Sequence, residues 1–492
     1  MKSWRLQGSL NGGEVSPLLY GRPDLAKFAS SLARCVGFVP LPQGGVTRRP
    51  GTRFVAAAKN ADMNAILVPF VFSRKQAYIL EMGDEYIRFF MNGGQLFNIT
   101  PNYTLLTESG DTLVTESGDT LVTEQTDPTA APYEVASPYS AADLDELQYA
   151  QTADVMYIAH PDHPPRTLVR SGHTSWTFAE LPFSNGPFLG YNITDSWTIR
   201  ASATTGTVTL TSTQDLFTDD HVDGLFLLEE DTSDDYSMWE PAKTYTASAK
   251  VRWENNVYQC VTGGTSGAVA PVHIEGNRWD GQASASCRWE YLHSGYGICV
   301  ITAVASATSA TALVLKRMPD AVVSQATPNW REGAWSPHQG WPRAVALFEQ
   351  RIWWGGTDLY PQTLWSSVGG DFTDYQPGDL DDDAIDWTIN SRQANPISAL
   401  VDGTNLHVLC EDTELIGRAS NNSAAVSPGD FTVRRSTSYG TAPVRPLTID
   451  IYTIIVDASG RRLVELGFDA AEDNFVPFDM TLYAEHITRP GQ

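Results

Sequence analysis

The chain has 492 residues, 42% of them hydrophobic, and its 58 acidic residues outnumber its 33 basic residues to give a net charge of −25. This balance argues against a protein that grips nucleic acid by neutralising phosphates, and no apolar stretch reaches the roughly 20 residues that span a bilayer. The length exceeds one compact core, so about two to four domains are expected, and abundant Trp, Tyr and Gly with few helical patterns favour mainly β structure.

Residues 1–58 are predicted to form an extended N-terminal arm. The first residues lack an apolar signal region, so we expect synthesis and folding in the cytosol. Gly- and Pro-rich motifs follow at 11–17 (NGGEVSP), 20–25 (YGRPDL) and 42–54 (PQGGVTRRPGTRF). Between them, residues 24–35 carry apolar side chains at helical spacing and predict a short helix. A segment so often interrupted cannot bury a core of its own, so we expect it to lie across a neighbouring surface.

The order of these three motifs closely resembles the opening of tail-tube and nozzle proteins of short-tailed bacteriophages. In that family they form a Gly-Gly-Glu-x-Ser-Pro element, an Arg-x-Asp-Leu helix and a closing Arg-Arg-Pro-Gly-Thr-Arg turn. The resemblance implies a virion structural protein whose arm contacts neighbouring copies, where an extended strand can pair with another chain's sheet edge. The residues that we expect at such a subunit interface are Gly12, Gly13, Glu14, Arg22, Asp24, Arg48, Arg49 and Arg53.

Residues 59–190 are predicted to be the first part of a β-propeller. Apolar runs at 65–72, 77–82, 86–90 and 153–160 are separated by short turns, and sheets of four short strands are the unit of a propeller. The line ADVMYIAHPDHPPRTLVR at 153–170 also resembles a blade strand and turn of the tail family. Between these runs, 107–114 (TESGDTLV) is repeated directly as 115–122, and we assign this repeat no chemistry.

Residues 191–325 are predicted to be an insertion of two small β-barrel or β-sandwich modules. The first, 191–235, holds a strand at 206–212, followed by a turn and a second strand within 216–228, and resembles modules inserted in phage tail proteins. The second, 236–325, is rich in aromatic residues and weakly resembles carbohydrate-binding modules. Trp253, Tyr258 and Trp279 are the candidates for glycan contact, with burial in the module core as the alternative role.

Residues 326–492 are predicted to be the second part of the propeller. Segments at 340–357, 361–367 and 370–375 each end in a Gly or Asp turn, and they resemble successive propeller strands of the tail family. The match continues to the AEHI segment at 484–487, after which family members usually add further strands. We therefore expect a smaller propeller, or one closed by another chain or by the N-terminal strands.

The motifs typical of enzymes and metal sites are missing from the sequence. The acidic run at 379–386 lacks the Gly and the terminal Glu of a calcium loop, and the histidines at 160 and 163 have no further ligand nearby. There is neither a phosphate-binding loop nor a nucleophile elbow. The five dispersed cysteines argue against a zinc site and a disulfide framework, although a local pair within 260–299 stays open. We expect no enzymatic activity, no cofactor and no bound metal.

By resemblance, the chain is expected to form a ring, of six copies, in the virion tail after assembly in the bacterial cytoplasm. The ring would hold the packaged genome and conduct DNA through its lumen without sequence-specific binding. Expected neighbours are adaptor and portal proteins above, tail fibre or needle proteins nearby, and the host surface at the distal end. The alternative is a receptor- or glycan-binding tail protein that acts through the aromatic insertion.

Overall fold

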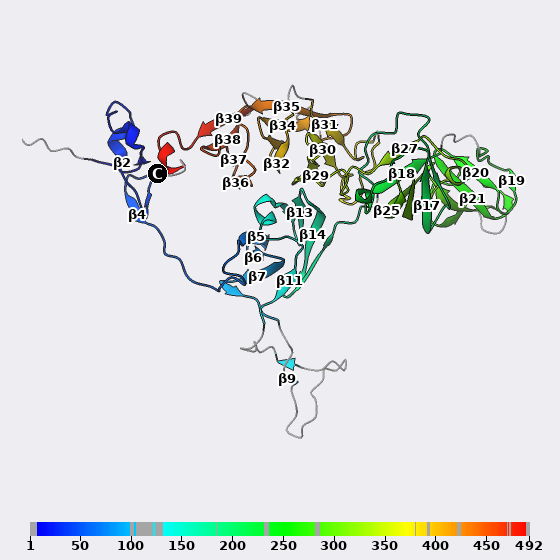
Figure 1. Ribbon diagram of the computed structural model, residues 1–492, viewed down its shortest axis with the longest axis horizontal. Coiled ribbons are helices and arrows are strands. Elements are labelled where there is room, and N and C mark those ends of the chain that lie inside the picture. The colour runs from blue at the N-terminus through cyan, green and yellow to red at the C-terminus, as the bar shows by residue number, and fades with distance from the viewer. Residues whose placement is uncertain are drawn as a thin grey trace, which may run out of the picture.

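The computed structural model describes residues 7–98, 103–104, 122–123, 131–183, 185–230, 236–280, 286–378, 380–390, 394–420, 425–469, 471 and 474–488. Within these residues the fold is almost entirely β, with one α-helix, α1 (Asp320–Ser324), and a few 3-10 turns. No helix in this part of the chain is long and apolar enough to cross a bilayer. The molecule is elongated, with the N-terminal arm at one end, a propeller in the middle and the inserted modules at the other end (Figure 1).

The propeller consists of five antiparallel sheets, here called blades 1 to 5, each built from one continuous stretch of chain apart from a long excursion in blade 1. Blades 2 to 5 are four-stranded meanders, as the sequence predicted. The strands are, for blade 1, β5 (Ile66–Ser73), β6 (Gln76–Gly83), β7 (Tyr86–Met91), β8 (Gly94–Gln95) and β11 (Glu134–Ala136); for blade 2, β12 (Gln148–Thr152), β13 (Val155–His160), β14 (His163–Gly172) and β15 (Ser175–Glu180); for blade 3, β28 (Ala344–Phe348), β29 (Arg351–Gly355), β30 (Thr363–Ser366) and β31 (Asp386–Thr388); for blade 4, β32 (Ile397–Val401), β33 (Leu406–Cys410), β34 (Glu414–Ala419) and β35 (Phe431–Thr437); and for blade 5, β36 (Leu447–Ile449), β37 (Tyr452–Val456), β38 (Leu463–Asp469) and β39 (Asn474–Asp479).

Successive blades pack face to face through buried apolar clusters. One cluster joins blades 1 and 2, another blades 2 and 3, a third blades 3 and 4, and a fourth blades 4 and 5. The first strands of all five blades, β5, β12, β28, β32 and β36, contribute to the lining of one central cavity of about 260 Å³. This arrangement of meander sheets around a common centre is that of a β-propeller.

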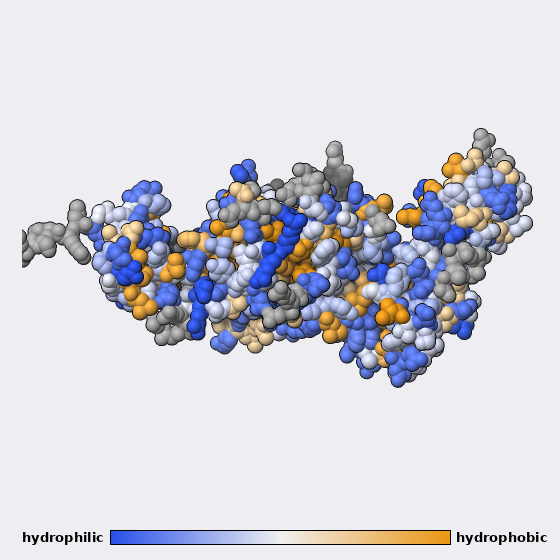
Figure 2. Space-filling model, turned by 90° about the horizontal axis from the view of Figure 1, so that it is seen from above, coloured by the Kyte–Doolittle hydropathy of each residue, from blue (hydrophilic) through white to orange (hydrophobic). Residues whose placement is uncertain are grey.

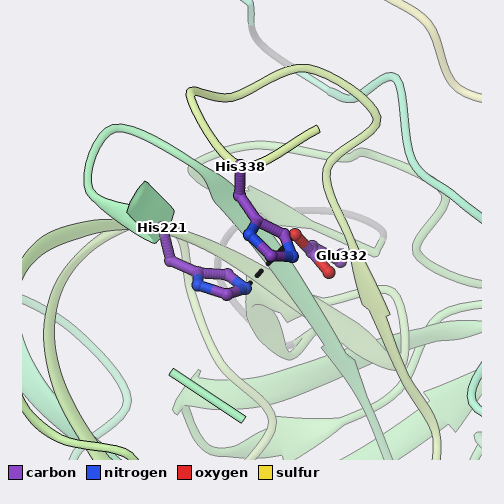
Figure 3. A group of neighbouring side chains, drawn as sticks. All are labelled: His221, Glu332 and His338. Atoms are coloured by element: carbon purple, nitrogen blue, oxygen red, sulfur yellow. Dashed lines mark ion pairs between the residues drawn. The ribbon is translucent and has the colours of Figure 1, made fainter. Parts of the chain in front are cut away.

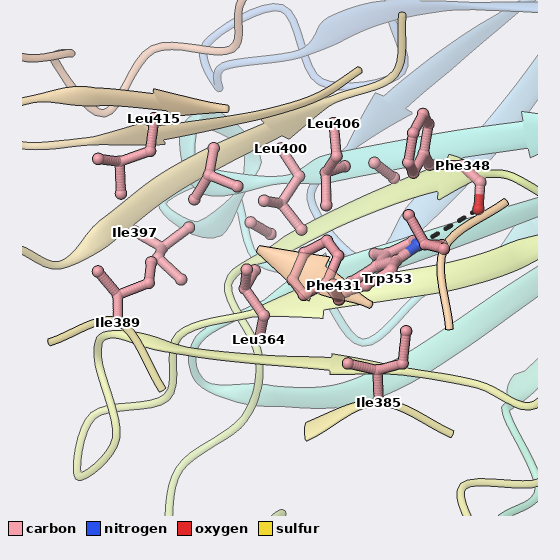
Figure 4. Close-up of a cluster of buried hydrophobic side chains, with 14 of the residues drawn as sticks. Phe348, Trp353, Leu364, Ile385, Ile389, Ile397, Leu400, Leu406, Leu415 and Phe431 are labelled. Carbon is pink, nitrogen blue, oxygen red and sulfur yellow. Dashed lines mark hydrogen bonds between the residues drawn. The ribbon is translucent and has the colours of Figure 1, made fainter. Parts of the chain in front are cut away.

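The cluster between blades 3 and 4 shows why the aromatic residues of the second half are needed (Figure 4). Trp353 is fully buried, its ring centroid lies 4.7 Å from that of Phe431, and its indole N–H donates to the Phe348 carbonyl at 3.2 Å. A buried Trp needs such an acceptor, because an unpaired indole N–H would be costly. The sequence run ending in Trp-Trp-Gly is therefore a core strand.

The ring of blades is not closed by the N-terminal strands, one of the closures that the sequence left open. The arm's strands, β1 (Gly13–Glu14), β2 (Ser31–Leu32), β3 (Phe38–Pro40) and β4 (Val46–Arg48), pair only with one another in the described part of the chain. No buried cluster of the described residues joins blade 5 to blade 1. Blades 1 and 5 therefore each keep an outward face.

The boundaries predicted for the two inserted modules, 235/236 and 325/326, are wrong, because the second module is nested within the first. The first module is a six-stranded sheet of β16 (Ile199–Ala201), β17 (Thr207–Ser212), β18 (Leu225–Glu229), β25 (Tyr296–Ser306), β26 (Ser309–Lys316) and β27 (Trp330–Glu332). The second lies between β18 and β25 and contains β19 (Thr244–Tyr245), β20 (Lys250–Trp253), β21 (Asn256–Thr262), β22 (Gly264–Thr265), β23 (Asn277–Trp279) and β24 (Arg288–His293). Long-range pairing of β18 with β25 and β27 sets these limits, and no local pattern reveals it.

The helix predicted over residues 24–35 is also wrong. Only one 3-10 turn, η2 (Phe28–Ser30), forms there. The Ser30 and Ser31 hydroxyls both donate to the Lys27 carbonyl, and Ser31 then enters a parallel pairing with Gly13. Such short polar side chains compete for the backbone groups that a helix would use, and the pairing with β1 prevails over helical spacing. The direct repeat at 107–122 lies outside the described residues except for its last position.

Gly440 provides a test of the packing between blades 4 and 5. Gly440 and Gly460 share a left-handed backbone (φ +69° and +68°), but a Cβ at 440 would overlap the Glu411 carbonyl, whereas one at 460 meets nothing within 4 Å. We expect Gly440→Ala to lower the urea midpoint of unfolding far more than Gly460→Ala, since only the former adds a steric clash to the backbone strain. Equal shifts in the two variants would contradict this packing.

Candidate functional site

The N-terminal arm and the C-terminal segment 480–488 form one small unit at the end of the molecule (Figure 1). The Ser16 N–H donates to the Tyr483 carbonyl at 2.8 Å, and the Lys27 ammonium lies 5.0 Å from the centre of the Tyr483 ring. These contacts join residues that are more than 450 positions apart in the sequence. We call this unit the terminal clasp.

Glu14 is the central residue of the terminal clasp. Its carboxylate accepts from the Cys35 N–H at 2.6 Å and lies 3.0 Å from Nε2 of His486, which belongs to the 3-10 turn η6 (Glu485–Ile487). The hydrogen bond from His486, followed by that from the Cys35 N–H, holds the pKa of Glu14 below its ordinary value. The sequence could not show this role, because nothing in the AEHI segment points to a partner at position 14.

The two predicted interface glycines also have internal roles. The Gly12 N–H donates to the Ser30 carbonyl at 3.0 Å, and a side chain at Gly12 would run into Ser30 and Ser31. Gly13 has φ +71°, a conformation that favours glycine. Together with Glu14, these residues build the arm itself rather than present its surface.

The remaining predicted interface residues lie on the surface. Arg22 and Asp24 form an exposed ion pair at 2.7 Å. Arg48 ends β4, and Arg49 and Arg53 follow it; all three are exposed and form no ion pair with another described residue. Their role in binding a neighbouring copy stays a prediction.

The arm has almost no core. Among residues 7–58 only Val15 and Ser16 are buried, whereas Phe54 is 79% exposed and Leu18 71% exposed. The C-terminal segment adds Leu482 and Ile487, which are both exposed. In the space-filling view apolar residues are visible at this end of the molecule among polar ones (Figure 2). So much exposed apolar surface on so small a unit is typical of an interaction surface.

The three candidates for glycan contact occupy different environments in the second inserted module. Tyr258 is fully buried and its hydroxyl donates to the His273 carbonyl at 3.0 Å, so the prediction that it contacts a glycan is wrong. Trp253 is half-buried and packs edge-on against Trp239. Trp279 is 38% exposed, with the Arg288 guanidinium 5.9 Å from its ring centre. Most of these aromatic residues therefore build the module core.

One group of described side chains, His221, Glu332 and His338, has the composition of a metal site (Figure 3). Nε2 of His221 lies 3.4 Å from the Glu332 carboxylate, and the two imidazole rings stack with centroids 4.1 Å apart. However, Nδ1 of His221 accepts the Thr218 backbone N–H at 3.0 Å, so the ring hydrogen sits on Nε2. A metal would need the lone pair at that atom. Burial lowers the pKa of His221 and raises that of Glu332, so it disfavours the charged form of both groups.

The acidic run near 379–386 is organised around an arginine instead of a cation. The buried Arg351 guanidinium donates to the backbone carbonyls of Asp381 and Asp383, both at 2.6 Å, and to that of Ser367 at 2.9 Å. Asp379 lies outside the described residues. The five cysteines are free thiols, and all except the half-buried Cys35 are buried, so the pair that stayed open within 260–299 is not formed. His160 is likewise buried beside His163 within blade 2.

The comparisons with known proteins give little to set beside this geometry. No family model matches the chain, and no curated protein matches its sequence. Among solved structures, a protein from Lactobacillus plantarum is similar at 11% identity and a TM-score of 0.30. The alignment covers 89% of this chain and 88% of that protein's chain. Apo AztD from Citrobacter koseri is similar at 10% identity and a TM-score of 0.23. The alignment covers 82% of this chain and 94% of the AztD chain. At these scores neither supports a conclusion, and the resemblance to tail-tube and nozzle proteins stays a prediction.

Glu14→Ala tests the terminal clasp. The change leaves the Cys35 N–H and the His486 ring without their acceptor, so we expect faster hydrogen–deuterium exchange at Cys35 and at Ser16, whose amide bonds to Tyr483. Loss of a charge-assisted pair of hydrogen bonds costs on the order of 1–3 kcal/mol. Asp24→Ala removes a fully exposed carboxylate and is the matched control. Unchanged exchange in the Glu14 variant would contradict the clasp.

Buried histidines predict that acid destabilises the propeller. His407, on β33, is 5% exposed, and burial lowers its pKa from 6.5 to about 4. As the pH falls, the unfolded chain binds a proton at His407 before the folded chain does. The contribution of His407 to the free energy of unfolding is therefore intact above pH 6.5 and is lost as the pH falls towards 4. At a pH of about 5 the loss is about 2 kcal/mol. Urea unfolding at a pH of about 7.5 and at a pH of about 5 measures how much stability is lost between the two. This loss should be smaller in His407→Gln than in the wild type by about 2 kcal/mol.

The matched control for this measurement is Thr453→Val. It removes the hydroxyl that lies 3.0 Å from Nδ1 of His407 but keeps the ring that titrates. We expect it to lower the stability at both pH values and to leave the pH dependence as in the wild type. The same pH dependence in His407→Gln as in the wild type would show that His407 does not contribute.

Proposed function

We propose that this chain is a structural subunit of a phage tail, which assembles into a ring that retains the packaged genome and conducts DNA during ejection. The observation that carries the proposal is the terminal clasp: an arm in which only two of the described residues, 7–58, are buried, held to the C-terminal segment by Glu14 and displaying exposed apolar side chains. A unit of this kind gains a stable core only by burying these side chains against another surface.

Ring closure requires contacts between different surfaces of identical chains. The elongated shape supports this, because the terminal clasp lies at one end of the molecule and the inserted modules at the other (Figure 1). The outward faces of blades 1 and 5 supply further exposed apolar residues, among them Leu67, Ile449 and Phe478. A ring of six copies in the virion tail, next to portal, adaptor and fibre proteins, is the assembly that the sequence resemblance favours.

The net charge of −25 suits a conduit for DNA. Phosphates bind proteins chiefly through lysine and arginine, with release of counterions, so an acidic lumen lets the duplex slide without adhering. The proposed activity needs neither a catalytic group nor a cofactor.

A second candidate function, glycan binding at the host surface, is favoured by one observation. Trp279 lies on the edge strand β23 and exposes part of its ring. Aromatic faces of this kind can pack on the apolar face of a sugar ring. With Tyr258 buried, the candidate contact surface is reduced to Trp279 and the half-buried Trp253.

Deletion of residues 1–55 tests the proposed assembly. We expect the wild type to form closed rings with a central channel and the truncated chain to be folded but monomeric, because the deletion removes most of the exposed apolar surface of the terminal clasp. Light scattering gives the mass, and electron microscopy shows any ring. Removal of 107–114, one copy of the direct repeat, is the control and should leave the number of chains in the assembly unchanged. A truncated chain that still forms rings would exclude the arm as the assembling element.

A further inference from the structure

A large cleft lies where blade 2, the first inserted module and the segment leading into blade 3 meet. Its volume is about 770 Å³, within the range of ligand and peptide pockets. Phe183, Leu315 and Trp341 are part of its lining, and all three expose some of their apolar surface. The cleft is formed by segments distant in sequence, so no local motif predicts it.

The cleft carries an excess of acidic side chains. Its lining contains four carboxylates, on Asp162, Glu180, Asp223 and Asp358, against the single basic side chain of Arg166. Glu180 is paired with Arg166 at 2.5 Å, and Asp358 with Arg343 at 2.7 Å. Asp162 and Asp223 have no ion pair with another described residue. An occupant with apolar and cationic side chains would complement this surface.

The last part of the N-terminal arm, residues 48–54, runs from the end of β4 towards blade 1 and has this chemistry; we call it the linker. Residues 48–54 read Arg-Arg-Pro-Gly-Thr-Arg-Phe, and from 49 onward they lie outside any strand or helix. Arg49, Arg53 and Phe54 are all exposed, and Phe54 at 79% is the most exposed phenylalanine of the described residues. Arginine and aromatic residues, phenylalanine among them, are enriched at the centres of protein interfaces.

We propose that the linker at 48–54 of one copy docks in the cleft of a second copy, with Phe54 among Phe183, Leu315 and Trp341 and Arg53 facing Asp162. The second copy is the occupant because the two surfaces are complementary in charge. Within one molecule, β4, where the linker begins, lies apart from β14 and β18, which contribute to the cleft lining, along the long axis (Figure 1). A contact between two different surfaces of identical chains is the kind that propagates around a ring. This inference rests on the proposed assembly and names the contact that would drive it.

The first experiment is a charge swap in the full-length protein, with assembly followed by sedimentation velocity over a range of concentrations. Arg53→Asp, Asp162→Arg and Phe54→Ala should each raise the concentration needed for half-assembly by about tenfold or more. Combining Arg53→Asp with Asp162→Arg should restore assembly towards the wild type, because the pair is re-formed with its signs exchanged. Arg74→Asp and Asp412→Arg, which change exposed charges elsewhere, are the matched controls.

The second experiment is a crosslink between copies. A mixture of Phe54→Cys and Leu315→Cys chains under mild oxidation should give a disulfide-linked dimer, whereas Phe54→Cys mixed with Val269→Cys, an exposed position in the second inserted module, should not. The wild type controls for Cys35. All these substitutions are at exposed positions, so thermal melting should show folded chains.

The outcomes separate this inference from the proposed function. Rings that form equally well in the Arg53, Phe54 and Asp162 variants, without the 54–315 crosslink, would overturn the docking contact and leave ring assembly standing. A wild type that stays monomeric at every concentration would overturn both. Loss of assembly in the single variants with no restoration by the swap would place the linker and the cleft in separate contacts, and would also overturn the docking.

Discussion

This fold depends on the packing of blade faces against one another. A four-stranded sheet has two faces, and it needs a neighbour to cover each of them. Each blade is too thin to bury its own apolar residues, so stability comes from face-to-face packing such as that of Trp353 on Phe431. Three blades have neighbours on both sides, but blades 1 and 5 do not. Blade 1 therefore exposes Leu67 and Ile79 on the face opposite its core residues, and blade 5 exposes Ile449 in the same way.

The terminal clasp, like blades 1 and 5, exposes apolar side chains that the described part of the chain does not cover. It is held mainly by polar contacts at Glu14 and by backbone pairing, not by a buried cluster. Charge-assisted hydrogen bonds orient groups well, but apolar burial supplies most of the free energy of folding. A unit with orientation but little burial would gain stability from a surface that covers its apolar side chains. In the proposed assembly, a neighbouring copy supplies such a surface to the arm.

The propeller could be predicted from sequence because its signals are local. Runs such as 65–72 and 77–82 alternate or cluster apolar residues between Gly and Asp turns, and the strands β5 and β6 form there almost as expected. The nested insertion could not be predicted, since the pairing of β18 with β25 brings together strands that lie about 70 residues apart. The predicted helix at 24–35 was wrong for the same reason: Ser31 pairs with Gly13, and a tertiary contact overrode the local spacing.

The predicted interface residues fall into two groups, those that shape the backbone of the arm and those that lie exposed on its surface. Gly12, Gly13 and Glu14 belong to a motif whose spacing is required by the arm's own backbone, so a sequence pattern detects them without telling whether they face inward or outward. Arg49 and Arg53 form no ion pair with another described residue, and they are exposed together with the neighbouring Phe54. Residues fixed internally explain how the arm is shaped, whereas the exposed residues are those through which we propose that it binds a neighbouring copy. The sequence alone does not separate these two groups, and the burial and hydrogen bonds of the folded arm do.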